Sequence, residues 1–422
     1  LMDTNQLMDK HVTVIGGGVA GLSAALHLAE SGIGVEVVER SAFLGGHAAG
    51  FTCKATDACV KCGACMVETL LGKAVQHQRI HLGTASRLEG VQTDDRMILE
   101  INREPQVIDP EVCDGCGRCH EICPAGAILQ GSSPHQIPFY ALDRHACTRN
   151  KGDTCSACSD ACPLRAIHLD RTAEREERKT DALVFATGFR PFDPQEKPYG
   201  YGVFKNVVTN LDLEKRLRKT GRLARPSDQK SPGRLAFIQC VGSRDAKLGH
   251  LWCSRVCCGS ALRMARLLKQ REPEIEITIF YIDIQSCGRD FESFYSQARR
   301  EIRFQRSIPG DIFENEDHTL NLSYVDDTDH ASTEEAFDMV VLSIGMLPNA
   351  ANSFRGADLE TSAEGFLASP CSGPPKASNG LFSAGSATGP MGIAESIASA
   401  GQTVNAVISY LSSRYPGPER RR

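Results

Sequence analysis

The first part of the chain contains a strand, a glycine turn, a helix and a second strand in close succession. HVTVI, from His11, is followed by GGGVAG, by the helix pattern LSAALHLAE and by the strand VEVVER. The turn fits G-x-G-x-x-G with Gly16, Gly18 and Gly21, and Glu39 ends the second strand. Such glycines let the backbone approach a pyrophosphate, and the acidic residue accepts from ribose hydroxyls. The pattern predicts a doubly wound α/β lobe that binds a dinucleotide; the alternative is a glycine-rich turn in a plain doubly wound sheet.

Several later segments fit the same lobe. A second glycine turn, LGGHAAG, begins at Leu44, and the strands DALVFATGFRP and DMVVLSIGMLPN begin at Asp181 and Asp338 and end in glycine turns. The segment from Gly380, GLFSAGSATGPMGIAES, leads into a helix. Together they resemble the two-lobe flavoproteins of the thioredoxin reductase and glutathione reductase type. That resemblance implies FAD, and beyond the fingerprint it implies contacts from these residues: Ala20, Arg40, Gly45, Gly46, His47, Ala186, Thr187, Gly188, Gly385, Ser386, Gly389, Pro390 and Ile393. For His47 the alternative is an ordinary polar residue of the turn.

The composition limits where such a chain can work. Eighteen cysteines in C-x2-C spacings favour metal ligands over disulfides in a reducing compartment. A net charge of -5 gives no reason to expect nucleic acid as a partner. The short segment before HVTVI leaves no room for a cleavable signal peptide, and no apolar run approaches the roughly 18 residues that span a bilayer. We therefore expect a cytoplasmic protein without direct membrane insertion.

The first cysteine cluster lies between the flavin-type segments, at residues 53–65. FTCKATDACVKCGACM has the spacing C-x5-C-x2-C-x2-C, formed by Cys53, Cys59, Cys62 and Cys65. Two-residue gaps let successive sulfurs point to a common centre. The spacing favours an iron-sulfur cluster, and zinc is the alternative.

Two further cysteine runs follow, each ending in Cys-Pro. The first has the spacing C-x2-C-x2-C-x3-C-P; the second has a wider first gap, and PAGAI and PLRAI repeat after the cysteines. The pair resembles a two-cluster ferredoxin, in which the last cysteine of each half binds the cluster of the other half. Two 4Fe-4S clusters are therefore predicted, the first held by Cys113, Cys116, Cys119 and Cys162, and the second by Cys147, Cys155, Cys158 and Cys123. The alternative is a set of buried free cysteines.

A second doubly wound lobe is predicted from Gly233. GRLAFIQC is a strand, CCGSALRMARLLKQ a helix and IEITIFYIDI a buried strand. No glycine fingerprint follows the first strand, and without those glycines a pyrophosphate cannot approach the helix N-terminus closely. Four cysteines stand there instead: Cys240, Cys253, Cys257 and Cys258. We infer that this lobe does not bind a nicotinamide nucleotide.

The spacing C-x12-C-x3-C-C, with VGSRD and WCSRVCC around it, is the most specific part of a wider resemblance. Nearly the whole chain resembles the HdrA subunit of heterodisulfide reductase and related subunits of other redox complexes. The resemblance implies that these four cysteines bind a 4Fe-4S cluster beside the flavin, which makes about four clusters. It also implies an oxidoreductase subunit that interconverts two-electron and one-electron transfer. The partners would be redox subunits like HdrB and HdrC, hydrogenase-like or dehydrogenase-like proteins, or a membrane quinone module.

Two departures from that family bear on the mechanism. Arg263 stands where the resemblance implies a lysine near the flavin, and arginine cannot donate a proton. Bifurcation of electrons at the flavin is then the alternative function, and a stand-alone NAD(P)H or disulfide oxidoreductase is a further one. The chain also ends at YPGPERRR without the C-terminal ferredoxin domain of the longer relatives, so we expect a partner subunit in its place.

The expected architecture has five consecutive parts. They are residues 1–105 and 171–232 for the flavin lobe with its cysteine insertion at 53–65, residues 106–170 for an α+β ferredoxin insert, residues 233–345 for the second lobe, and residues 346–422 for the end of the flavin lobe. Outside the four ligand groups, Cys287 and Cys371 are expected to be spare thiols, and Trp252 is expected to shield the adjacent cluster from water. Glu395 is expected to be a helix-surface acid rather than a group that polarises the flavin.

Overall fold

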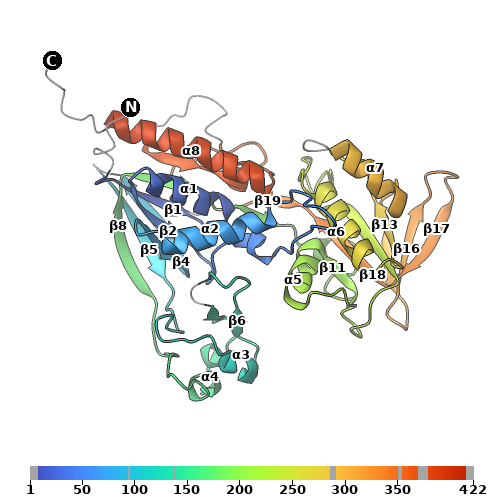
Figure 1. The fold of residues 1–422 in the computed structure, drawn as a ribbon, viewed down its shortest axis with the longest axis horizontal. Coiled ribbons are helices and arrows are strands. Elements are labelled where there is room, and N and C mark those ends of the chain that lie inside the picture. Colours follow the sequence, from blue (N-terminus) through green and yellow to red (C-terminus); the bar gives the residue numbers. More distant parts are fainter. Residues whose placement is uncertain are drawn as a thin grey trace.

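Two α/β lobes lie side by side, and a small insert projects from the first lobe (Figure 1). The structure is a computed structural model that describes residues 8–93, 96–136, 139–285, 291–349, 354–368 and 379–414. Cys287 and Cys371 lie outside the described residues.

The first lobe is built on a five-stranded parallel sheet in the order β20-β9-β1-β2-β3. The strands are β1 (His11–Ile15), β2 (Gly34–Val38), β3 (Ile80–Gly83), β9 (Ala182–Phe185) and β20 (Leu381–Ser383). One face packs against helices α1 (Val19–Glu30), α2 (Ala64–Gln76) and α8 (Ile393–Arg414). The other face packs against an antiparallel sheet of β4 (Ser86–Thr93), β5 (Met97–Arg103) and β8 (Glu174–Thr180). Alternating valines, such as Val12 and Val14 on the helix side, make this a sheet that is buried on both faces.

The second lobe repeats this plan. Its parallel sheet has the order β11-β18-β12-β13-β14, from β11 (Val207–Thr209), β12 (Arg234–Val241), β13 (Glu276–Phe280), β14 (Arg303–Gln305) and β18 (Met339–Ile344). Helices α5 (Asn210–Thr220), α6 (Cys257–Arg271) and α7 (Phe291–Glu301) cover one face. The antiparallel strands β15 (Asp311–Glu314), β16 (Leu320–Val325) and β17 (Ser332–Phe337) cover the other face. The unit β12-α6-β13 thus corresponds to β1-α1-β2.

The chain crosses between the lobes through a two-stranded antiparallel link, β10 (Phe189–Pro191) with β19 (Met346–Pro348). The expected boundary at residue 232 is wrong. Strand β11 pairs with β18, and Leu213 and Leu217 of α5 lie in the second hydrophobic core, so both elements belong to the second lobe. The sequence did not reveal this, because the short apolar strand β11 has no feature that distinguishes one parallel sheet from the other.

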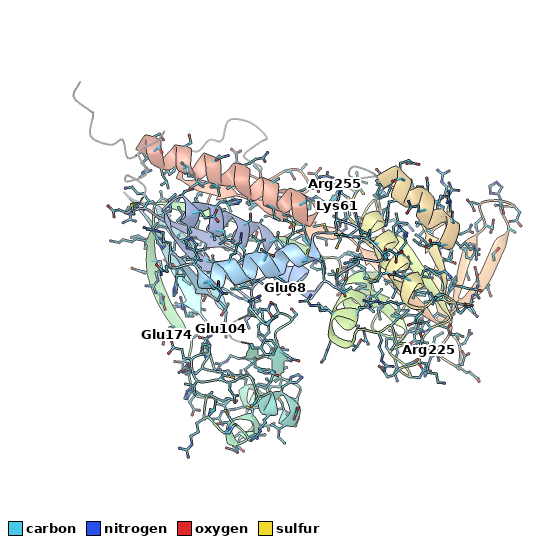
Figure 2. The ribbon with its side chains drawn as sticks, viewed as in Figure 1. Lys61, Glu68, Glu104, Glu174, Arg225 and Arg255 are labelled. Carbon is cyan, nitrogen blue, oxygen red and sulfur yellow. The ribbon has the colours of Figure 1, made fainter. Side chains whose placement is uncertain are left out.

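The insert contains β6 (Ile128–Gln130), β7 (Tyr140–Leu142) and the short helices α3 (Arg118–Ile122) and α4 (Ala157–Asp160). Its two ends meet where Ile108 and Ile167 form an antiparallel bridge. Figure 2 labels Glu104 and Glu174 where the chain leaves and re-enters the first lobe. The side chain of Gln136 donates to the Leu44 carbonyl at 2.7 Å, which ties the insert to the first lobe.

A helix that crosses a bilayer must be both long and apolar. Within the described ranges, none of the helices combines the length and the apolar character that such a crossing requires.

Candidate FAD and iron-sulfur sites

The glycine fingerprint packs closely where β1 meets α1 and β9. Gly16 has a φ of +107°, and a Cβ there would lie 2.3 Å from the Ala186 carbonyl oxygen. A Cβ at Gly21 would lie 1.8 Å from the Gly16 carbonyl oxygen. At Gly18, in contrast, the nearest atom to a Cβ would be the Cα of Gly46 at 4.0 Å. Gly16 and Gly21 therefore serve the fold, while Gly18 faces free space.

That free space lies at the N-terminus of α1, for which Gly18 is the N-cap and supplies no side-chain hydrogen bond. The first backbone N–H groups of a helix have no partner within the helix and favour a negative charge. Glu39 is buried, and its carboxylate accepts from the N–H groups of Gly17 and Ser41 at 2.7 and 2.8 Å. A carboxylate has further lone pairs for ribose hydroxyls. These features fit the pyrophosphate and ribose of FAD.

The second glycine turn lies directly on the first. The N–H of Gly45 donates to the Gly17 carbonyl at 2.7 Å, and a Cβ at Gly46 would lie 3.2 Å from the Cα of Gly18. The His47 ring packs 4.8 Å from the Phe189 ring centroid, with Nε2 3.4 Å from the Phe189 carbonyl oxygen. Burial lowers the pKa of His47, and the Phe189 carbonyl opposes that shift. The ring is therefore neutral near pH 7. Arg40 is exposed.

The closing segment joins the same region. A Cβ at Gly385 would lie 2.3 Å from the Cβ of Ala20, so this segment packs on α1. Ser386 Oγ lies 3.9 Å from the position of a Cβ at Gly188, in the turn after β9. The remaining predicted residues lie beside these contacts. The Ala186 N–H donates to the Ile15 carbonyl, and the Thr187 carbonyl accepts from the Asn349 side chain. Gly389 has a φ of +147°, the Pro390 carbonyl accepts from the Arg255 side chain, and Ile393 packs on Gly63.

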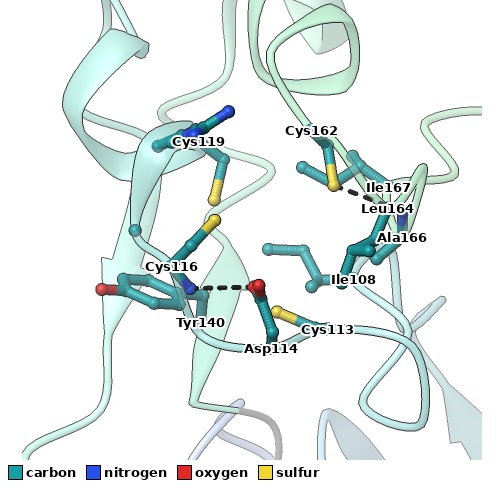
Figure 3. Close-up of a pocket in the computed structure, with 12 residues that line it drawn as sticks. Ile108, Cys113, Asp114, Cys116, Cys119, Tyr140, Cys162, Leu164, Ala166 and Ile167 are labelled. Atoms are coloured by element: carbon teal, nitrogen blue, oxygen red, sulfur yellow. Dashed lines mark hydrogen bonds between the residues drawn. The ribbon is translucent and has the colours of Figure 1, made fainter.

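The insert gathers cysteines from both of its halves around a first pocket. Cys113, Cys116, Cys119 and Cys162 line one pocket together with Tyr140. Figure 3 shows the sulfurs of Cys116 and Cys119 facing the shared space and Cys162 entering from the other side. Burial raises the pKa of Cys119 to about 11, and the nearby Cys113 adds to the shift. The fourth thiol thus comes from the second cysteine run, as the ligand exchange between halves requires.

A second pocket has the complementary set. Cys123, Cys147, Cys155 and Cys158 line it together. Burial raises the pKa of Cys158, and Cys123 and Cys147 raise it further. Two backbone N–H groups donate to thiols beside these pockets: Ala127 to Cys123 at 3.2 Å and Ala166 to Cys162 at 3.3 Å. Such donors favour a thiolate, so both pockets fit iron-sulfur clusters.

Of the cysteines at 53–65, Cys53, Cys59 and Cys62 lie on a loop between the two lobes, and Cys65 lies in the first turn of α2. Cys53, Cys59 and Cys65 are exposed, and Cys62 is half-buried. The loop is fixed by α6, since Arg263 Nε donates to the Val60 carbonyl at 3.3 Å. Nowhere in the described part of the chain do three His, Cys, Asp or Glu side chains lie close enough to hold a single metal ion. Iron-sulfur ligation by these four thiols stays a prediction, with zinc as the alternative.

The remaining four cysteines form what we call the second-lobe cysteine group: Cys240, Cys253, Cys257 and Cys258. Cys240 has a φ of +60° in β12, where the pairing with β18 shifts register. Cys257 and Cys258 begin α6, the position that the dinucleotide fingerprint occupies on α1. Burial is the main cause of a raised pKa at Cys257, and the charges of Cys258, Cys240 and Cys253 raise that pKa further. The four cysteines therefore lie at the end of β12, in the connection that follows it and at the start of α6, where a pyrophosphate-binding turn would otherwise stand.

One side chain joins this group to the closing segment of the first lobe. Arg255 donates to the Pro390 carbonyl at 3.2 Å and to the Glu395 carboxylate at 2.7 Å. Its N–H donates to the Cys253 sulfur at 3.2 Å. Figure 2 places Arg255 at the junction of the lobes, by the inner end of α8. The second-lobe cysteine group thus lies against the segment that is predicted to face the flavin.

Three other predicted residues have defined surroundings. The Arg263 guanidinium lies over the Phe294 ring and contacts Val60, so it lies at the 53–65 loop. Its role near the flavin stays a prediction. Trp252 donates to the Met346 carbonyl at 3.0 Å and packs on Phe366, which fits a shielding role. Glu395 is half-exposed and paired with Arg255, in agreement with a helix-surface acid.

The sequence reasoning missed three polar residues near the cysteines. Arg255 is part of the WCSRVCC motif, and its position between two predicted ligand cysteines is the sequence feature that could have indicated a role at this group. Lys54 forms a buried ion pair with Glu214 of α5 directly after Cys53. Gln239 precedes Cys240 and is fully buried.

Comparison with known proteins agrees with this arrangement. Residues 11–58 match a family of FAD dependent oxidoreductases, and residues 107–129 match the 4Fe-4S binding domain. The structure resembles thioredoxin reductase from T. acidophilum, with a TM-score of 0.54 at 13% identity over 95% of this chain and 99% of that one. The Lactococcus lactis thioredoxin reductase gives 0.54 at 15% identity over 96% and 100%. The chain is therefore a two-lobe α/β protein of the thioredoxin reductase fold with a ferredoxin-type insert, which confirms the expected fold class.

Within that class the chain is similar to the HdrA subunits of heterodisulfide reductases. It is 35% identical over 419 residues to the HdrA subunit of the H(2):CoB-CoM heterodisulfide,ferredoxin reductase of Methanothermobacter marburgensis, covering 93% of this chain and 62% of that protein. It is 34% identical over 427 residues to the iron-sulfur HdrA subunit of the CoB--CoM heterodisulfide reductase of Methanocaldococcus jannaschii, covering 95% and 64%. The predicted family resemblance is confirmed. The chain spans a little under two thirds of the length of these relatives.

Proposed function

We propose that the chain is an oxidoreductase: a FAD- and iron-sulfur-containing electron-transfer subunit of a heterodisulfide-reductase-like complex. FAD exchanges electrons in pairs or singly, and iron-sulfur clusters carry single electrons. The observation that carries the proposal is the position of Arg255, whose contacts join the second-lobe cysteine group to the closing segment at Pro390 and Glu395. A group held there would lie against the flavin side of the first lobe.

The chain's own residues have distinct tasks in this proposal. Helix α1 offers its free N–H groups to the pyrophosphate, and Glu39 accepts from the ribose. The sixteen cysteines in four sets hold the clusters, and the two pockets of the insert bury Cys119 and Cys158. Trp252 and Phe366 exclude water beside the second-lobe cysteine group. A dry environment and hydrogen bonds to sulfur set the potential of such a group.

The partners follow from the chemistry and from the names of the relatives. One relative is named for H(2), the CoB-CoM heterodisulfide and ferredoxin, and another, from Methanosarcina acetivorans, for ferredoxin and the CoB-CoM heterodisulfide. We propose that this chain passes electrons between redox subunits of the same general kind. The described residues offer no nucleotide fingerprint in the second lobe, so its electrons would come from a partner rather than from bound NAD(P)H.

Analysis of iron, acid-labile sulfide and flavin in anaerobically purified protein tests the proposal. Four 4Fe-4S clusters and one FAD predict about sixteen irons per flavin. Fewer than about eight irons per flavin would contradict the proposed set of clusters. Zinc in place of about four irons would show that the 53–65 loop holds zinc.

The two alternatives receive less support. The residues 242–256 that connect β12 to α6 contain glycine only at positions 242 and 249 and no G-x-G-x-x-G, so measurable NAD(P)H binding is not expected. Arg263 contacts Val60 and Phe294, and these contacts give no support to electron bifurcation.

A further inference from the structure

Strand β12 contains a bulge at its end, beside the second-lobe cysteine group. Ile238 pairs with Leu342 and Val241 pairs with Ile344 on the parallel neighbour β18. Two residues of β12, Gln239 and Cys240, therefore stand opposite a single residue of β18, Ser343. A bulge of this kind redirects side chains and ends regular pairing.

Gln239 and Ser343 are buried polar residues whose side-chain polar atoms have no hydrogen-bond partner among the described residues. Each side chain is 1% exposed. In the described part of the chain, neither polar atom of the Gln239 amide is hydrogen-bonded, and neither is the Ser343 hydroxyl. Leaving a buried donor or acceptor unsatisfied is unfavourable, so such groups usually face a water, an ion or a ligand.

The face of the sheet on which they lie is the one that α6 covers. Leu235 and Phe237 pack in the same core as Ala261 and Leu262 of α6. Strand side chains alternate, so Gln239 continues the series of Leu235 and Phe237 toward α6. By the same alternation Ser343 continues the series of Met339 and Val341 in that core. Both side chains thus point beneath the N-terminal turn of α6.

The cysteines of that turn are close by. The Cys257 sulfur lies 3.9 Å from the Ile344 carbonyl oxygen, one residue beyond Ser343. Cys240 follows Gln239 directly. A third buried polar side chain, that of Ser254, accepts from the Met346 N–H at 2.8 Å, and it opposes the rise in the pKa of Cys257 that burial causes. One buried hydroxyl thus lies at the cysteine group, and beside it lie two more polar side chains that have no hydrogen-bond partner among the described residues.

We propose that Gln239 and Ser343 donate hydrogen bonds to the iron-sulfur cluster of the second-lobe cysteine group and raise its reduction potential. The inference rests on the proposed function, because it requires a cluster at this group. Hydrogen bonds to cluster or cysteine sulfur stabilise the reduced state, which carries the more negative charge. The two side chains would then favour electron transfer into this cluster.

The test compares Gln239→Met and Ser343→Ala in the full chain, reconstituted anaerobically with Fe²⁺ and sulfide. Gln239→Met removes both polar atoms at similar length. The matched control is Ser23→Ala, which removes another buried hydroxyl without a partner, on α1. A Cys257→Ser variant identifies the paramagnetic resonance signal of this cluster by its loss. A redox titration then follows that signal in each variant.

We expect each of the two variants to lower the midpoint reduction potential of the cluster. At a fixed potential the ratio of oxidised to reduced cluster should rise about tenfold, which corresponds to a shift of about 59 mV for one electron. Ser23→Ala should leave the midpoint unchanged. Without iron, both variants should unfold at no lower temperature than the parent, because no protein hydrogen bond is lost. Loss of the signal in variants whose iron-free stability is unchanged would also support the inference.

Two results would overturn the inference alone: an unchanged midpoint in both variants, or a lower iron-free stability in both. The proposed function fails separately if Cys257→Ser removes neither iron nor a signal, because then no cluster occupies the group. That result would end the inference as well.

Discussion

Arg255 of the second lobe and Glu395 of the first form an ion pair, with 2.7 Å between Nη2 and Oε1. The Arg255 N–H also donates to Cys253, so one residue contacts both the second-lobe cysteine group and the start of α8. Both side chains are about half exposed, at 48% and 50%. Exposed pairs contribute at most about 1 kcal/mol. The pair therefore matters for where it holds the cysteine loop rather than for overall stability.

We predict that Arg255→Gln changes the free energy of unfolding by less than about 1 kcal/mol, yet slows electron transfer out of reduced flavin severalfold. The cysteine loop loses its contacts with Pro390 and Glu395, so its distance from the closing segment is less well defined. Stopped-flow absorbance of the flavin, with a one-electron acceptor, measures the rate. The control is Arg149→Gln, which removes an exposed pair with Asp170 in the insert. Equal rates in both variants would contradict the prediction.

Cys162→Ser tests the exchange of ligands between the halves of the insert. Cys162 belongs to the second cysteine run but lines the pocket of Cys113, Cys116 and Cys119. The substitution should therefore disturb the first cluster, with up to about four irons lost. Cys123→Ser should disturb the other pocket. Paramagnetic resonance spectra of the two variants should lose different signals, and loss of the same signal in both would refute the exchange.

The sequence predicted the elements whose patterns depend on local chemistry. The fingerprint at Gly16 to Gly21 and the paired cysteine runs have spacings that geometry imposes, and the structure places those residues around common spaces. The missing fingerprint in the second lobe also agrees with the long connection from β12 to α6.

Features that depend on long-range pairing could not be predicted. Strand β11 belongs to the second lobe only because it pairs with β18, more than a hundred residues away in sequence. The unpaired amide of Gln239 and the partner of Lys54 depend in the same way on packing between distant segments. A sequence pattern gives the alternation of side chains but not the identity of their neighbours.

Lys54 and Glu214 form a buried ion pair between the 53–65 loop and α5, with exposures of 5% and 3%. We predict that Lys54→Met lowers the free energy of unfolding by about 3 to 5 kcal/mol, because Glu214 is left buried without a countercharge. The double variant Lys54→Met/Glu214→Leu should recover most of that loss, since an apolar pair avoids desolvating two charges. Chemical denaturation measures all three proteins. A double variant as unstable as the single one would contradict the argument.

The same pair predicts a pH dependence. Burial raises the pKa of Glu214 above its ordinary value of 4.5, although Lys54 opposes the shift. The folded protein then holds this proton more tightly than the unfolded chain does. The stabilisation that comes from protonated Glu214 is therefore fully present below the ordinary pKa. It decreases as the pH rises from the ordinary to the raised pKa, and it does not change further above the raised pKa. In Glu214→Gln this decline should disappear from a plot of unfolding free energy against pH. A decline as steep as in the parent would assign it to other groups.

Gly18 and Gly21 separate binding of the dinucleotide from folding. Gly18 has a φ of -80°, which alanine tolerates, and a Cβ there meets no atom nearer than 4.0 Å. We predict that Gly18→Ala keeps the unfolding free energy within about 1 kcal/mol of the parent value. The same substitution should weaken FAD binding at least tenfold, which is about 1.4 kcal/mol of binding free energy, because the methyl group enters the space of the pyrophosphate. Gly21→Ala should instead destabilise the fold by about 1 to 3 kcal/mol, since its Cβ would overlap the Gly16 carbonyl. Flavin fluorescence titration and thermal unfolding of both variants distinguish the two effects. Parent-like FAD affinity in Gly18→Ala would show that the pyrophosphate does not lie at this helix terminus.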